Sequence, residues 1–101
     1  MEFITAQKLS QLQHMESLLL VQYTAKWCSP CKTLTPRLEG IGFEYPNVTF
    51  VKIDVEDNKD HITELGIRTV PTVMIYRGSE LIDQSTGLKP NSYYEEILNK
   101  L

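Results

Sequence analysis

The segment from Leu18 to Tyr23 constrains the fold more than any other part of the sequence. It runs Leu-Leu-Leu-Val-Gln-Tyr and is almost continuously apolar. The segment is too short for a typical helix and far too short to cross a membrane. Strands that are apolar on both faces are typical of sheets that helices cover on both sides. We therefore expect a buried strand here, in an α/β protein.

Strand and helix patterns alternate along the rest of the chain. Thr5 is a plausible N-cap for a first helix, in which apolar and polar residues follow at helical spacing. These residues are Leu9, Leu12, Met15 and Glu16. Further strands are expected over 48–55, 72–76 and 80–86, and further helices from 28–31 onward, over 58–65 and after Pro90. The order predicts a largely parallel sheet, made mixed by a final hairpin at Gly78-Ser79, with about five strands and four helices in one domain over 1–101.

Composition is that of an ordinary globular protein. The chain has 101 residues, 42% of them hydrophobic, so one modest core is feasible and a second domain is not. A net charge of -3 without a basic stretch argues against nucleic-acid binding. The start, Met1 to Ile4, lacks the pattern of a secretory signal, so we expect a cytoplasmic protein without a membrane partner.

Cys28 and Cys31 are the two cysteines of the chain. In a reducing cytosol such a pair is more often catalytic or metal-binding than structural. Residues three apart on a helix are neighbours, so the pair can close into a disulfide or open with little backbone movement. The pair also lies between an expected strand and an expected helix, whose N-terminus stabilises a reactive thiolate. Lys26 and Lys32 flank the pair and add to the positive field.

The two cysteines are expected to have different roles. Cys28 lies at the entrance of the helix, so we expect it to be the attacking nucleophile. Cys31 lies one turn further in, so we expect it to be more buried and to resolve the mixed disulfide. Pro30 lacks an N–H and favours a helix start. This arrangement predicts thiol–disulfide exchange.

Half of a zinc site is the alternative for a C-x-x-C pair. Zinc usually takes four ligands from two such pairs, and the remaining soft ligands, His14 and His61, lie in no paired motif. We expect His14 on a solvated helix face and His61 on the exposed side of the third helix. The chain also lacks a dinucleotide fingerprint, so we expect no metal and no cofactor beyond a redox-active disulfide.

Several separated motifs resemble those of the thioredoxin family, over essentially the whole chain. Residues 27–32, Trp-Cys-Ser-Pro-Cys-Lys, match its central motif, except that Ser29 stands where the family usually has glycine. Residues 66–72, Gly-Ile-Arg-Thr-Val-Pro-Thr, match a second motif. Pro36 matches the family's kinking proline, and Gly87 matches a glycine near the substrate groove.

The resemblance implies a thioredoxin fold and a monomeric disulfide reductase that acts in electron transport and cell redox homeostasis. Its partners would be client proteins with disulfides and a thioredoxin reductase or equivalent electron donor. The Val70–Pro71 bond is implied to be cis, with the Val70 backbone free to bind an extended substrate. The Trp27 ring is implied to be partly exposed beside the groove. The other groove candidates are Thr69, Val70, Gly87 and Leu88.

Gln22 departs from the family pattern, because the resemblance places a buried aspartate there that relays a proton to or from the buried thiol. Glutamine cannot ionise, so it cannot be a general base. Two interpretations stay open: resolution of the mixed disulfide is slower, or Gln22 merely fills the space. Ser29 is a second departure, and residues between the cysteines influence the redox potential.

Two rival functions also stay open. An oxidant or isomerase would use the same cysteines, and the lack of a signal sequence argues against it. A thioredoxin-fold binding subunit would not need them, and the presence of both cysteines with Pro30 and Pro71 argues against that.

Overall fold

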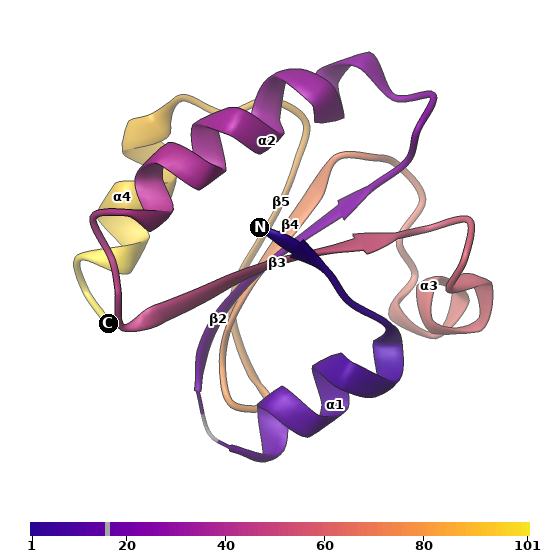
Figure 1. Cartoon of the computed structure of the whole chain (residues 1–101), viewed down its shortest axis with the longest axis horizontal. Helices are drawn as coiled ribbons and strands as arrows, with labels where there is room; N and C mark the ends of the chain where they lie inside the picture. Colours follow the sequence, from indigo (N-terminus) through magenta and orange to yellow (C-terminus); the bar gives the residue numbers. More distant parts are fainter. Residues whose placement is uncertain (16) are drawn as a thin grey trace.

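The computed structural model describes residues 1–15 and 17–101 (Figure 1). Glu16, which we expected to continue the first helix, lies outside the described residues. The strands are β1 (Glu2–Phe3), β2 (Leu18–Thr24), β3 (Val48–Asp54), β4 (Thr72–Arg77) and β5 (Glu80–Thr86). The helices are α1 (Ala6–His14), α2 (Ser29–Gly42), α3 (Lys59–Leu65) and α4 (Asn91–Leu98). The predicted mixed sheet of five strands with four helices is therefore confirmed over this part of the chain.

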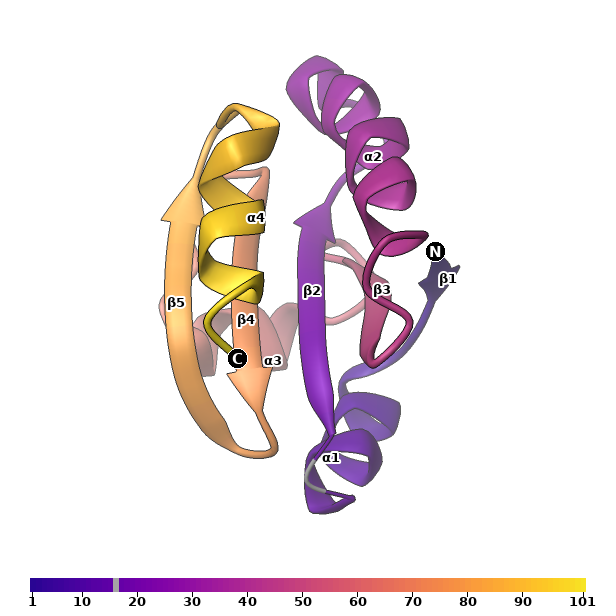
Figure 2. The ribbon, with the colours of Figure 1, turned by 90° about the vertical axis from the view of Figure 1, so that its left-hand side faces the viewer.

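The strands form one sheet in the order β1-β3-β2-β4-β5, with β2 at its centre. Figures 1 and 2 show this sheet between two pairs of helices, with α1 and α3 on one face and α2 and α4 on the other. From Leu19 to Thr24 every residue of β2 is buried, as expected for a strand covered on both sides. No helix in the described ranges is long and apolar enough to span a bilayer.

The expectation of a largely parallel sheet with one antiparallel hairpin is wrong for one of the four strand pairings, that of β4 with β2. β3 runs parallel to β1 and β2, but β4 runs antiparallel to both β2 and β5. α3 is also too short to carry the chain back along the sheet by itself. Its seven residues advance about 10 Å, whereas returning along the seven residues of β3 takes about 23 Å. The chain therefore enters β4 at the end of the sheet where it leaves β3.

Several local signals in the sequence position the elements correctly. Thr5 caps α1 by accepting a hydrogen bond from the backbone N–H of Lys8 at 3.1 Å. Gly66 ends α3 in the left-handed conformation, with φ of 69°. Gly78 and Ser79 form the two-residue turn between β4 and β5. Pro36 lies inside α2, as expected.

The hydrophobic core is divided by the sheet into two layers. Side chains of β2 alternate between them, with Leu19, Val21 and Tyr23 facing α1 and α3, and Leu20 facing α2 and α4. Gln22, which is fully buried, lies on the same face as Leu20. A polar side chain thus interrupts the second layer directly under the start of α2.

Candidate active site

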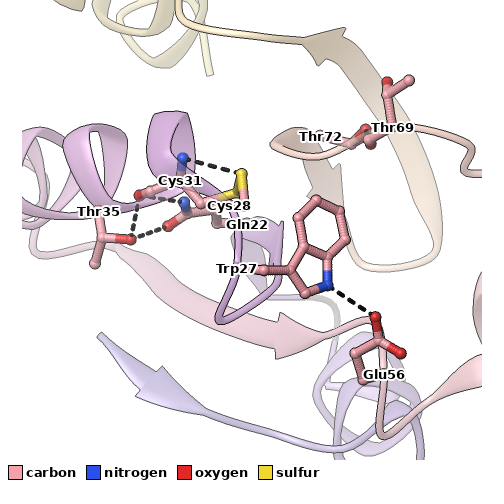
Figure 3. Close-up of a disulfide and its surroundings, with 8 residues drawn as sticks. All are labelled: Gln22, Trp27, Cys28, Cys31, Thr35, Glu56, Thr69 and Thr72. Atoms are coloured by element: carbon pink, nitrogen blue, oxygen red, sulfur yellow. Dashed lines mark hydrogen bonds between the residues drawn. A yellow bond between two sulfur atoms is a disulfide. The ribbon is translucent and has the colours of Figure 1, made fainter.

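Cys28 and Cys31 lie where β2 leads into α2, and they form a disulfide with a Cα–Cα distance of 5.3 Å (Figure 3). Cys28 is the N-cap of α2, and Ser29 and Pro30 follow it in the first turn. Both cysteines are buried and form a cluster with Ala25, against which Val55 and Val70 pack. The strand-to-helix junction predicted from the sequence therefore carries the pair.

The two cysteines differ in hydrogen bonding rather than in burial. Their exposed fractions are 3% for Cys28 and 1% for Cys31, so accessibility hardly separates them. However, the backbone N–H of Cys31 donates to Cys28 Sγ at 3.2 Å. Cys28 Sγ thus lies at the positive end of α2 with an amide directed at it. Such a position stabilises negative charge on that sulfur.

Gln22 is tied to the first turn of α2 by its amide group. Its Nε2 donates to the carbonyl oxygen of Cys31 at 3.3 Å, and its Oε1 accepts from Thr35 Oγ1 at 2.9 Å (Figure 3). Thr35 Oγ1 is also 2.9 Å from the Cys31 carbonyl oxygen. Both polar ends of the buried amide therefore have partners, which removes most of the cost of burying it.

Thr35 was missed by the sequence analysis. It follows Cys31 by one helical turn, so helical spacing places its hydroxyl on the face that carries the cysteine. That signal becomes specific only once Gln22 is known to lie against the same face.

Trp27 projects from the loop before Cys28 and is 67% exposed, in agreement with the expected partly exposed ring. Its Nε1 donates to Glu56 Oε1 at 2.9 Å (Figure 3). Glu56, also missed from the sequence, lies in the loop after β3. The backbone N–H of Glu56 donates to Asp54 Oδ1 at 2.8 Å, and Asn58 Nδ2 donates to the Asp54 carbonyl at 2.8 Å. A hydrogen-bonded loop thus holds the indole ring.

The segment before β4 lies beside the disulfide. The Val70–Pro71 peptide bond is cis, and Val70 packs against the cluster that the two cysteines form with Ala25. Gly87, with φ of 78°, donates its N–H to the Pro71 carbonyl at 2.9 Å, which joins the segment after β5 to it. Leu88 is 45% exposed. Thr69 is exposed, and its carbonyl accepts from Thr72 Oγ1 at 2.7 Å.

Charged side chains near the pair are mostly solvated. Lys26 and Lys32 are both exposed, so water screens the positive field expected from them. Within the described residues, no group of three or more His, Cys, Asp and Glu side chains is placed to hold a metal ion.

Within the described residues, neither histidine belongs to a group of side chains that could hold a metal ion with the cysteines. His14 is exposed on α1, as expected. The expectation that His61 faces solvent is only partly right, because the residue is half-buried and its Nε2 lies 2.9 Å from the hydroxyl of the buried Tyr23. Burial lowers the pKa of His61 below its ordinary value of 6.5, and Glu64 partly opposes this shift. A helix of seven residues gives too short a pattern to show which side faces the sheet.

Comparison with known proteins agrees with this geometry. The Thioredoxin family model matches residues 3–100. Thioredoxin H8 of Arabidopsis thaliana is 38% identical over 93 residues, which cover 92% of this chain and 62% of that protein. Thioredoxin of Bacillus subtilis is 34% identical over 86 residues, covering 84% of this chain and 83% of that protein. Oxidised mitochondrial thioredoxin 3 of Saccharomyces cerevisiae has a TM-score of 0.89 at 27% identity, over 100% of this chain and 95% of that one.

Fold, disulfide and helix N-terminus together define a thiol–disulfide oxidoreductase that works by dithiol exchange. The chain belongs to the thioredoxin family, whose named members are protein-disulfide reductases. The family and the class of activity predicted from the sequence are thereby confirmed.

Proposed function

We propose that this chain reduces disulfides of client proteins, with Cys28 as the attacking thiolate and Cys31 as the resolving thiol. The observation that carries the assignment is the hydrogen bond from the Cys31 N–H to Cys28 Sγ at the start of α2. It favours the thiolate form of Cys28, and the thiolate is the nucleophile in disulfide exchange.

The reaction has two exchanges. Cys28 thiolate attacks one sulfur of a client disulfide, a mixed disulfide forms, and the other client sulfur leaves as a thiolate. Cys31, as a thiolate, then attacks Cys28 Sγ and releases the second client sulfur. Two electrons pass to the client, and the chain is left with the Cys28–Cys31 disulfide seen in the structure.

The exposed surface around the disulfide is the proposed client site. Trp27 and Leu88 offer apolar area, at 67% and 45% exposure. The segment at Val70 and Pro71 offers backbone groups beside the sulfurs, which would pair with an extended client strand. Thr69 and Gly87 border the same surface, while Ser29 and Pro30 shape the first turn of α2. Gln22, Lys26 and Lys32 are supporting residues in this proposal.

The proposed partners follow from the chemistry. Regeneration of the dithiol needs an electron donor of the thioredoxin-reductase type, because the disulfide is the only redox group in the proposal. We propose that the chain acts as a cytoplasmic monomer in cell redox homeostasis and electron transport, without metal or organic cofactor. A nucleic-acid or membrane partner forms no part of this function.

An insulin-reduction assay with dithiothreitol tests the proposal. Wild-type chain should accelerate reduction, and Cys28→Ser should lose the acceleration completely. Cys31→Ser should accumulate a mixed disulfide through Cys28, visible as a mass shift that a reductant reverses. Full turnover by Cys28→Ser, or capture of the client on Cys31 in wild type, would contradict the assignment. A reduction potential of the pair above that of glutathione would instead indicate an oxidant.

A further inference from the structure

A cavity of about 300 Å³ opens behind the disulfide, between α2 and the sheet, and reaches Cys31. Most of the exposed lining area is apolar, but polar side chains also reach the cavity at several points. The lining is formed by Phe3, Thr24, Ala25, Lys26, Cys31, Lys32, Thr35, Pro36, Lys52 and Asp54. A cavity of this size has room for several water molecules, which the polar side chains in its lining can bind.

The register of the sheet explains why polar groups collect here. Gln22 is paired with Lys52 and Thr24 with Asp54 in the parallel ladder between β2 and β3. Paired residues of neighbouring strands project from the same face, so all four lie on the α2 side, with Gln22 touching α2. The carboxyl ends of the two strands thus deliver a carboxylate, an ammonium and a hydroxyl to the space behind Cys31.

The second exchange needs a proton acceptor in this place. Cys31 is 1% exposed, and its thiol must lose a proton before it can attack. Gln22, which donates a hydrogen bond to the Cys31 carbonyl oxygen, cannot ionise. Asp54 is the carboxylate in the cavity lining, and it is 8% exposed. The Glu56 N–H anchors one of its oxygens at 2.8 Å, so the carboxylate is held in position.

We propose that Asp54 accepts the proton of Cys31, relayed by water in this cavity, during resolution of the mixed disulfide. This inference rests on the function proposed above. In the step, the Cys31 S–H bond breaks and its proton passes through water to the Asp54 carboxylate. The Cys31–Cys28 S–S bond forms as the bond from Cys28 to the client breaks. The client sulfur leaves as a thiolate and takes a proton from solvent. Asp54 later releases to solvent the proton that it received from Cys31.

The charges around Asp54 fit this role. Lys52, which is half-buried, lines the same cavity, so the carboxylate is not an isolated buried charge. The ammonium of Lys52 also lies 4.1 Å from the centre of the Phe3 ring, which holds it at the cavity wall. On the other side of Asp54, Lys26 and Asp57 line a neighbouring cavity.

Asp54→Asn is the test, because asparagine keeps the oxygen that accepts the Glu56 N–H but cannot take up the proton. The readout is stopped-flow reaction of the reduced chain with an aromatic disulfide that releases one coloured thiolate per exchange. The second, concentration-independent phase is resolution. We expect it to slow by about tenfold or more. Its rate should also become proportional to hydroxide, because hydroxide must then replace the carboxylate. Asp57→Asn is the matched control and should leave both phases unchanged.

Whether Asp54→Asn slows or speeds the second phase distinguishes a proton acceptor from a carboxylate that acts only through its charge. Loss of a negative charge near Cys31 stabilises its thiolate, so a carboxylate acting only through its field would make Asp54→Asn faster. Rescue is a second test: Gln22→Asp in the Asp54→Asn background should restore the rate and flatten its pH dependence. Thermal unfolding of each variant reports whether it is folded.

Three results would overturn the inference. These are an unchanged or faster second phase in Asp54→Asn, an equal loss in Asp57→Asn, and a slow phase whose pH profile matches that of wild type. In all three the first phase still shows attack by Cys28, so the proposed function survives. A wild-type chain without a first phase would overturn both.

Discussion

The two faces of β2 differ sharply, although they are built from alternate residues of one seven-residue strand. On the α1 and α3 side, Leu19, Val21 and Tyr23 are fully buried in a mainly hydrophobic layer. On the α2 side the strand changes from Leu20 to Gln22 and Thr24 as it approaches the disulfide. The face of β2 toward α1 and α3 therefore buries apolar side chains along its whole length. The face toward α2 gives up some apolar burial near the disulfide, where polar side chains lie beside the cysteines.

Leu19→Ala should have the largest effect on stability. Leu19 is fully buried on the hydrophobic face, so truncation leaves a cavity and should lower the free energy of unfolding by about 2–5 kcal/mol. Activity per folded molecule should remain, because Leu19 belongs to the layer that packs against α1 and α3 and not to the cluster around the cysteines. Urea unfolding and the insulin assay measure the two quantities. A variant that is as stable as wild type, or folded but inactive, would break the division between the faces.

Thr35→Val should have a smaller effect, on the polar face. Valine cannot donate to Gln22 Oε1, so a buried amide oxygen loses its partner and the unfolding free energy should fall by about 1–2 kcal/mol. Thr35→Ser keeps the hydroxyl and serves as the control. The reduction potential of the pair should also shift in the valine variant only, since Thr35 contacts the Cys31 carbonyl as well. Equal stability of the serine and valine variants would exclude the hydrogen bond as the cause.

The smallest expected effect is a pH dependence on the hydrophobic face. Burial lowers the pKa of His61, with Glu64 opposing, so the folded chain binds a proton at this site less readily than the unfolded chain. Stability is therefore fully present above the ordinary pKa of 6.5 and is lost as pH falls below it. The melting temperature of wild type should fall over this window more than that of His61→Gln. Parallel pH curves for the two proteins would contradict this account.

Much of this arrangement was predictable from local patterns. The apolar run at 18–23, the hairpin at Gly78 and the cap at Thr5 are properties of neighbouring residues, and the structure has each of them. The junction at Cys28 and Cys31 was predictable for the same reason. Gln22 was singled out only because a family pattern marked its position as unusual.

The features that were missed depend on segments distant in the sequence. Glu56 became visible as a partner of Trp27 only when the loop after β3 was placed beside the loop before α2. Asp54 lies behind Cys31 because of the register between β2 and β3. Neither strand's residues alone show that register. The direction of β4 depended on the length of a connection, and the side of α3 that carries His61 depended on packing against Tyr23.

The sulfur atom of Cys28 has two structural roles. It forms half of the disulfide, and it also accepts the N–H that caps α2. Opening the disulfide leaves that acceptor in place and gives it more negative charge, which strengthens the cap. The helix start is thus supported in either oxidation state, and clients would meet the same surface whichever way electrons are moving. Alkylation of Cys28 would prevent the disulfide and leave a weaker acceptor, so it should loosen the first turn of α2 as well as stop the chemistry.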